Sequence, residues 1–119
     1  AKRLKVGACL VLDTGALIPG VNGLPTQLGN ECEYISCDGE LVTKQETIHA
    51  EIAVLLRAAK TGLSTQNSTL YLSHSPCFAC SSAMIAAGVK EIVYAEDYRD
   101  KRPVVMLEGC GIIVRQFDL

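Results

Sequence analysis

The stretch of residues 69–96, TLYLSHSPCFACSSAMIAAGVKEIVYAE, decides the fold of this chain of 119 residues. Residues 69–73 and 91–95 are rich in β-forming side chains and predict two strands, whereas residues 77–87 predict a helix between them. Two strands that are joined through a helix favour a parallel pairing in one sheet. The stretch therefore predicts a strand–helix–strand unit, with the sequence PCFAC (residues 76–80) where the helix begins.

The sequence on either side extends this unit into an α/β pattern. The other predicted strands lie at residues 5–12, 16–21 and 112–117, and the other predicted helices lie at residues 48–60 and 102–108. The first two strands form a hairpin around Asp13-Thr14-Gly15. We expect one domain over residues 1–119, with a three-layer α/β/α fold, a mixed sheet of about five strands and helices on both faces. Because the chain starts without Met and enters a strand almost at once, we expect that an N-terminal helix can precede it.

Two local features refine this pattern. Thr47 is the expected cap of the helix at residues 48–60, whose apolar stripe is expected at Ile52, Leu55, Leu56 and Ala59. Residues 22–45 contain glycine and asparagine but no clear periodicity, and they predict a long loop. Long loops in small domains are often functional, so this segment is a candidate substrate or effector surface.

Composition excludes several classes of protein. Hydrophobic residues make up 49% of the chain, which excludes disorder, and the formal net charge of −2 disfavours a phosphate-binding surface for nucleic acid. No apolar run approaches the roughly 18 residues of a membrane span. Six cysteines without a signal peptide indicate a reduced, cytoplasmic protein rather than a disulfide scaffold. We expect a small-molecule substrate, with no nucleic acid and no membrane partner.

The motif His49-Ala50-Glu51 combines with Cys77 and Cys80 into a candidate zinc site. One imidazole and two thiolates supply three ligands, and a catalytic zinc keeps its fourth position open for water. Glu51 then remains as a general acid/base beside the metal. H-x-E followed by P-C-x-x-C is the known signature of zinc-dependent base deaminases. The alternative is a surface histidine, a solvated glutamate and a structural or redox cysteine pair, since each half of the pattern is weak alone.

With these residues the chain resembles the zinc-dependent cytidine deaminase superfamily and, within it, the deoxycytidylate (dCMP) deaminases. The resemblance extends over nearly the whole chain. It includes the strand Lys5-Val6-Gly7-Ala8, the segment Val21-Asn22-Gly23-Leu24-Pro25, where the family has an aromatic residue in place of Val21, and Asn30-Glu31-Cys32-Glu33.

The resemblance implies a zinc-dependent hydrolysis of dCMP to dUMP and ammonia, with regulation by dCTP as activator and dTTP as inhibitor, and a magnesium ion bound with the effector. It also implies a homo-oligomer, often a hexamer, in the cytoplasm, or in the host cytoplasm if a phage encodes the protein. The substrate contacts that it implies are Asn22, the backbone of Ala50 and Ser75, and Tyr98. The effector contacts that it implies are Lys2, Arg3, Lys5, Asn22, Gly23 and Gly29.

Several alternatives stay open at this point. The chain can be another zinc-dependent nucleoside or nucleobase deaminase, a tRNA adenosine deaminase, or a catalytically inactive nucleotide-sensing module. The acidic balance disfavours the tRNA substrate, and an intact Glu51 disfavours the inactive module. His74 and Cys32 are candidates for a second, structural zinc, but spacing does not complete its four ligands.

Overall fold

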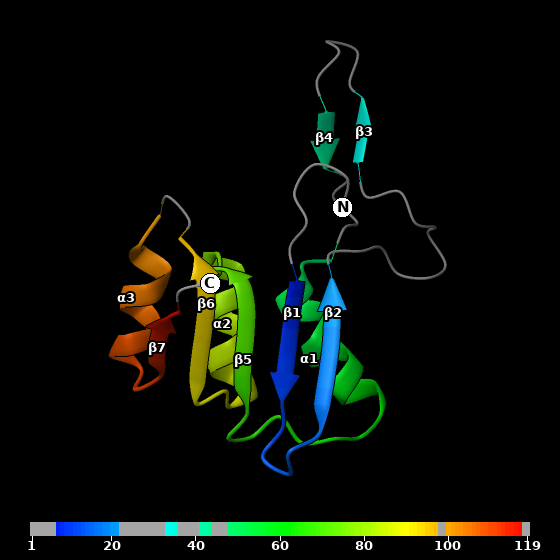
Figure 1. Ribbon diagram of the computed structural model, residues 1–119, viewed down its shortest axis with the longest axis vertical. Coiled ribbons are helices and arrows are strands. Elements are labelled where there is room, and N and C mark those ends of the chain that lie inside the picture. The colour runs from blue at the N-terminus through cyan, green and yellow to red at the C-terminus, as the bar shows by residue number, and fades with distance from the viewer. Residues whose placement is uncertain (1–6, 22–32, 36–40, 44–47, 98–99, 118–119) are drawn as a thin grey trace.

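The predicted strand–helix–strand unit is present in the computed structural model as β5 (Thr69–His74), α2 (Phe78–Ala87) and β6 (Glu91–Glu96) (Figure 1). β5 and β6 pair in parallel, as the connecting helix requires. Helix α2 ends where Gly88 takes the left-handed conformation, with φ of 82°. A residue without a Cβ adopts this conformation at little cost, so the predicted end of the helix is confirmed.

The structure describes residues 7–21, 33–35, 41–43, 48–97 and 100–117, and for 33–35 and 41–43 it describes the backbone alone. Within these residues the remaining elements are β1 (Gly7–Val11), β2 (Leu17–Val21), β3 (Glu33–Ile35), β4 (Leu41–Thr43), α1 (Ala50–Lys60), α3 (Arg102–Gly109) and β7 (Ile113–Gln116).

Five of these strands form one mixed sheet in the order β2-β1-β5-β6-β7. β1 is antiparallel to both β2 and β5, whereas β5, β6 and β7 are parallel to one another. A tight turn joins β1 to β2, with the Leu12 N–H donating to the Ala16 carbonyl at 2.9 Å and Gly15 at φ 92°. The α/β class and the five-stranded mixed sheet are confirmed.

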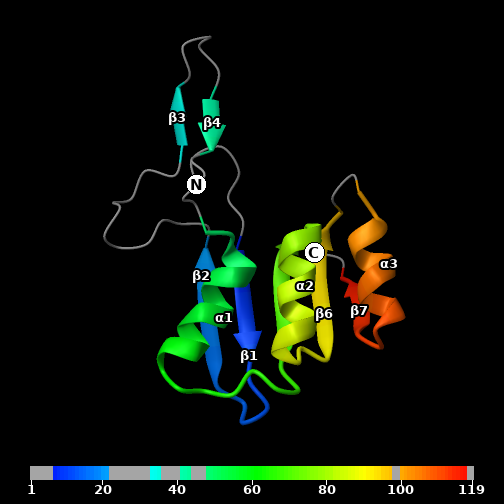
Figure 2. The ribbon, with the colours of Figure 1, turned by 180° about the vertical axis from the view of Figure 1, so that it is seen from behind.

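The three helices pack against one face of this sheet (Figures 1 and 2). α1 contacts β1 and β2, α2 contacts α1, and α3 contacts α2 and β7. The two crossovers from β5 to β6 and from β6 to β7 step in the same direction, and right-handed crossovers then place α2 and α3 on the same side. The helix-facing core contains Leu10, Leu70, Met84, Ile92 and Leu107, all fully buried.

The other face of the sheet has no helix over it among the described residues. Its large apolar side chains are partly exposed, from 38% for Phe117 to 68% for Val21. They are Leu17, Val21, Tyr71, Ile113 and Phe117. The second helical layer of the expected three-layer fold therefore remains a prediction. None of the described helices has the length and apolar character needed to cross a membrane.

Two details differ from the sequence-based expectation. The long loop expected over residues 22–45 contains a small antiparallel ladder, β3 with β4, which stands apart from the main sheet in Figure 1. Three-residue strands are too short to give a periodic signal, which explains why the pattern did not indicate them.

Helix α1 begins at Ala50 with His49 as its N-cap, not at residue 48, and Thr47 lies outside the described residues. Its expected stripe was also wrong in part, because Leu56 is 52% exposed and Ala59 is exposed. The buried face consists of Ala50, Glu51, Val54, Leu55 and Ala58. Apolar spacing allowed either neighbouring stripe, and the position of the helix over β1 and β2 selects one.

Candidate metal centre and active site

Two helix N-termini bring the predicted metal ligands together. His49 is the N-cap of α1 and Cys77 is the N-cap of α2, while Cys80 lies within the first turn of α2. His49 Nδ1 is 3.8 Å from the Sγ of Cys77 and 3.4 Å from the Sγ of Cys80. All three ligand atoms lie within 4.8 Å of one another, so the three side chains can share one ion.

These distances fit tetrahedral zinc. Bond lengths of about 2.0–2.1 Å to imidazole nitrogen and about 2.3 Å to thiolate, at a tetrahedral angle, separate nitrogen from sulfur by about 3.6 Å. The two observed separations, 3.4 and 3.8 Å, lie on either side of that value. The residues present therefore fit zinc in their donor types, their number and their spacing.

Glu51 lies beside these ligands in the first turn of α1. Its side chain is only 4% exposed, and burial raises the pKa of its carboxyl above the ordinary value of 4.5. A hydrogen bond from its own backbone N–H and the nearby His49 act in the opposite direction. A buried carboxyl whose proton affinity is raised in this way is suited to accepting a proton and returning it.

The two cysteines differ in their environments. A hydrogen bond from the thiol of Cys80 lowers the pKa of Cys77 to about 5, and His49 contributes in the same direction. Cys80 is buried, with 2% of its surface exposed. Its hydrogen bond to Cys77 and its burial both raise the pKa of its thiol. The lowered pKa favours the thiolate form of Cys77, which is the form that binds a metal.

The ligands lie at the end of the sheet where its parallel strands finish. Cys77 comes three residues after the last residue of β5, and the segment after β6 starts at the same edge. In open α/β sheets, ligand sites lie outside the carboxyl ends of the strands. The substrate is therefore expected to approach this edge, near the N-termini of α1 and α2.

Of the predicted substrate contacts, the structure places two at this edge. Ala50 is the first residue of α1 and is fully buried, and Ser75 follows β5 and is 1% exposed. Asn22 and Tyr98 lie outside the described residues. So do the predicted effector contacts, which are Lys2, Arg3, Lys5, Gly23 and Gly29.

Two polar residues next to the site were not predicted to act there. His74, the last residue of β5, contacts Glu96, the last residue of β6, with 3.2 Å between Nε2 and Oε2. Sequence had indicated His74 only as a candidate for a second zinc, together with Cys32, which lies outside the described residues. In the sequence, the signal that could have indicated a role for His74 at this site is its position directly before Ser75-Pro76-Cys77.

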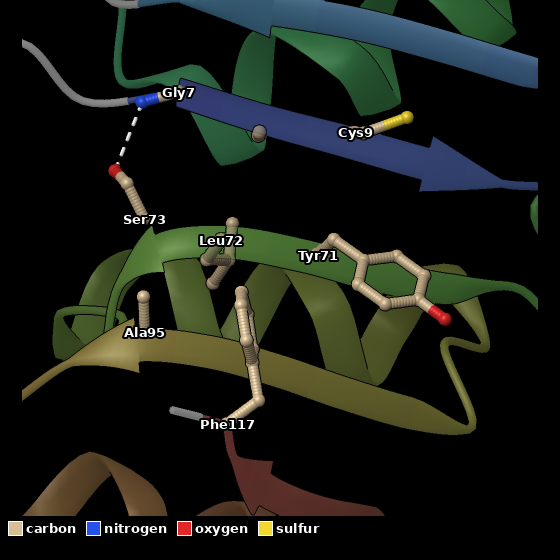
Figure 3. Close-up of a pocket in the computed structure, with 8 residues that line it drawn as sticks. Gly7, Cys9, Tyr71, Leu72, Ser73, Ala95 and Phe117 are labelled. Atoms are coloured by element: carbon tan, nitrogen blue, oxygen red, sulfur yellow. Dashed lines mark hydrogen bonds between the residues drawn. The ribbon is translucent and has the colours of Figure 1, made fainter. Parts of the chain in front are cut away.

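An apolar pocket of about 320 Å³ lies elsewhere, on the sheet face without helices (Figure 3). Tyr71 and Cys9 extend from its strands, and Phe117 closes one side. None of the three metal-ligand candidates lines it. The pocket is thus separate from the candidate active site.

Comparison with known proteins agrees with a zinc site at these residues. Residues 1–96 match the family model for the cytidine and deoxycytidylate deaminase zinc-binding region. The chain is 35% identical over 119 residues to ComE operon protein 2 of Bacillus subtilis, covering 98% of this chain and 62% of that protein. It is also 35% identical over 122 residues to deoxycytidylate deaminase of Saccharomyces cerevisiae, covering 97% of this chain and 38% of that enzyme. The chain thus spans less than two thirds of these curated relatives.

Solved structures agree with this comparison. The crystal structure of dCMP deaminase from the cyanophage S-TIM5, in complex with dCMP and dUMP, superposes with a TM-score of 0.84 at 36% sequence identity. The match covers 97% of this chain and 82% of that chain. The similarity therefore includes the sheet, the three helices and the ends of the strands at which the candidate ligands lie.

Proposed function

The chain belongs to the family of cytidine and deoxycytidylate deaminases with a zinc-binding region, and on this premise we propose that it hydrolyses dCMP to dUMP and ammonia. The observation that carries the proposal is the gathering of His49, Cys77 and Cys80 around one point, with the buried Glu51 beside them. The similarity to a dCMP deaminase that was crystallised with dCMP and dUMP supports the choice of substrate.

His49, Cys77 and Cys80 are the proposed zinc ligands. Bound zinc would supply Lewis-acid activation of water near neutral pH. Three protein ligands leave a coordination position for that water, whereas a structural zinc site fills all four with side chains.

Glu51 is the proposed general acid/base. Its carboxylate accepts a proton from the attacking water and delivers it to the ring nitrogen beside the amino-bearing carbon. It then takes the second proton of the water and delivers it to the amino group, which leaves as ammonia. One water is consumed for each dCMP, and the burial that raises the pKa of Glu51 helps it to hold the proton between these transfers.

The substrate contacts belong to the same proposal. The backbone N–H of Ala50 and the carbonyl of Ser75 are assigned to the pyrimidine edge, Asn22 to the deoxyribose and Tyr98 to the nucleotide. The position of Ala50 and Ser75 at the ligand edge of the sheet supports the first two assignments.

Regulation is the finer part of the proposal. We propose activation by dCTP and inhibition by dTTP with Mg²⁺, in a cytoplasmic homo-oligomer that is a hexamer. The support is the resemblance of the segment from Val21 to Pro25 to dCMP deaminases. Measuring the rate with dCTP, with dTTP and with neither, at saturating Mg²⁺, tests it, and equal rates under all three conditions would contradict it. Light scattering at several protein concentrations tests the hexamer.

Substrate choice is tested by incubating the purified protein with dCMP, CMP, deoxycytidine and a tRNA anticodon stem. We expect a uracil product from dCMP at the highest kcat/KM. Deamination of deoxycytidine or of the tRNA stem in preference to dCMP would assign the chain to another deaminase of the superfamily. No product from any substrate, in protein that holds zinc, would favour the nucleotide-sensing module.

A further inference from the structure

We propose that His74 is a positioning residue, which orients the Ser75-Pro76-Cys77 segment at the metal site through a hydrogen-bond chain across three strands. The proposal rests on the proposed deaminase function and deepens it. It concerns a residue outside the metal ligands and outside the expected substrate contacts.

The chain of contacts can be followed atom by atom. The Gly7 N–H donates to Ser73 Oγ at 3.0 Å, as the dashed line in Figure 3 shows. Ser73 Oγ is 2.9 Å from Nδ1 of His74, and Nε2 of His74 is 3.2 Å from the Glu96 carboxylate. With the ring proton on Nε2, each group donates to the next: the Ser73 hydroxyl to Nδ1, and Nε2–H to Glu96. The Gly7 backbone and the three side chains together connect β1, β5 and β6.

The location of His74 indicates more than packing. Every second residue of β5 faces the helices, and the first two of these, Leu70 and Leu72, are 0% and 3% exposed. At the next such position an apolar side chain would continue the core. The strand instead carries an imidazole that is 16% exposed and has polar partners at both ring nitrogens.

The segment after His74 also contacts Glu96, in this case through the backbone. The Ser75 N–H donates to the carbonyl of Glu96 at 2.9 Å, and Pro76 is fully buried. Only two residues separate His74 from Cys77, so a rotation of the strand end moves Cys77 directly. Metal–ligand distances lie within about 0.2 Å of their standard values, which makes the geometry of this segment important for the metal.

The contact between His74 and Glu96 is expected to contribute little to the free energy of unfolding. The Glu96 side chain is 69% exposed, and even a fully charged pair at such exposure contributes little to folding. We therefore expect that loss of the chain alters metal geometry and turnover more than it alters the unfolding temperature.

The experiment uses four single variants of the full chain. His74→Phe keeps a ring but removes both hydrogen bonds, and His74→Gln places an amide N–H near the position of Nε2. Glu96→Ala removes the acceptor. Glu91→Ala is the matched control, because Glu91 is the first residue of the same strand and bonds Arg115 at 2.6 Å.

Four quantities are measured for each variant: kcat and KM for dCMP, the visible absorption spectrum after Co²⁺ replaces zinc, the rate of zinc loss to a chelator, and the unfolding temperature. We expect His74→Phe and Glu96→Ala to lower kcat by about 10-fold or more with a smaller change in KM, to alter the Co²⁺ spectrum and to release zinc faster. His74→Gln should recover part of each loss, and Glu91→Ala should behave as the wild type.

Wild-type kcat and an unchanged Co²⁺ spectrum in both His74→Phe and Glu96→Ala would overturn the proposal. Equal losses in Glu91→Ala and Glu96→Ala would also overturn it, because they would indicate a general effect of strand stability. If His74→Phe does not fold, the comparison of Glu96→Ala with Glu91→Ala decides in the same way. If the wild type does not deaminate dCMP, the proposed function fails, and the spectrum and the zinc-release rate still test the role of His74.

Discussion

At the scale of one residue, Glu51 is a carboxyl buried beside the candidate metal ligands. A carboxyl that is 4% exposed would normally destabilise its surroundings when ionised, yet it lies at the N-terminus of α1, where the helix dipole favours negative charge. Burial raises the pKa of this carboxyl, whereas the helix N-terminus favours its charged form, so the two influences oppose each other at this position.

The first prediction concerns this carboxyl. Glu51→Gln keeps the size and hydrogen-bonding shape but cannot take a proton, so kcat for dCMP should fall on the order of 10² to 10⁴-fold while zinc remains bound. Steady-state kinetics and elemental analysis of the purified variant measure both. Glu108→Gln, at an exposed carboxyl on α3, is the control and should have wild-type kinetics. Normal turnover by Glu51→Gln would disprove the assigned role.

Asp100 and Arg102 provide a second test at this scale. The Arg102 guanidinium donates to both carboxylate oxygens of Asp100, with 2.7 Å from Nη2 to Oδ2, and lowers the pKa of Asp100 to about 2. A lowered carboxyl pKa means that this pair stabilises the fold above pH 3.8 and that its contribution disappears as the pH falls toward 2.

Arg102→Ala should therefore move the pKa of Asp100 part of the way up toward 3.8, because the guanidinium donors are lost while the backbone N–H of residue 102, 3.0 Å from Oδ1, still donates. Carboxyl carbon chemical shifts measured by NMR between pH 1.5 and about 6 would follow this change. Lys101→Ala is the control, since Lys101 pairs with Asp97 at 2.6 Å and should leave Asp100 unchanged. An Asp100 pKa that stays near 2 without Arg102 would contradict the attribution.

At the scale of elements, the ends of helices determine the site. His49 and Cys77 are both N-caps, and neither uses its side chain to cap its own helix. Their side chains are thus directed to each other, across the gap between α1 and α2. The C-terminal end of α2 also needs a defined geometry, because only Gly88 and two further residues connect it to β6.

The third prediction compares two glycines at helix ends. Gly88→Ala should destabilise the protein by about 1–2 kcal/mol, because φ is 82° and a Cβ there would lie 3.2 Å from Cα of Gln66 and closer to its side chain. Gly109→Ala, at the end of α3, should instead stabilise it by about 0.5–1 kcal/mol, because φ is not positive and a Cβ would meet no atom within 4 Å. Urea denaturation of both variants measures the two values. The same sign in both would contradict this explanation.

At the scale of the whole molecule, a bound metal would connect elements that share few other contacts. α1 packs on β1 and β2, whereas α2 follows β5, and the candidate ligands lie on both helices. The core is continuous below them and includes Leu10, Val54, Leu70 and Met84. Zinc would thus stabilise the folded state, because the unfolded chain does not hold these ligands together.

The fourth prediction is that removal of zinc lowers the unfolding temperature. At free zinc 1,000-fold above its Kd, binding contributes about 4 kcal/mol, which corresponds to a shift of roughly 15–20 °C for a chain of this size. Calorimetry before and after chelation, and after zinc is added back, measures the shift. Cys80→Ala should show little or no shift in the same experiment. An unfolding temperature that is independent of zinc in the wild type would exclude the site.

Much of the fold could be predicted from local sequence. Strands β5 and β6 and helix α2 were predicted within one or two residues, because alternation, helical spacing and a terminal glycine are local signals. The ladder of β3 with β4 was missed because it is short. The buried face of α1 was partly wrong, because spacing alone does not determine which of two adjacent stripes meets the sheet.

The sequence by itself indicated the candidate ligand types and the candidate acid/base residue, and it determined the order of the main helices and strands, because these depend on side-chain chemistry and on neighbours within a few residues. The tertiary structure confirmed that His49 meets Cys77 across 28 positions of chain. It alone decided that Glu51 is buried, that the helices share one face of the sheet and that His74 meets Glu96. Contacts between distant residues follow from how the helices and strands pack, and packing depends on the whole core rather than on any one segment.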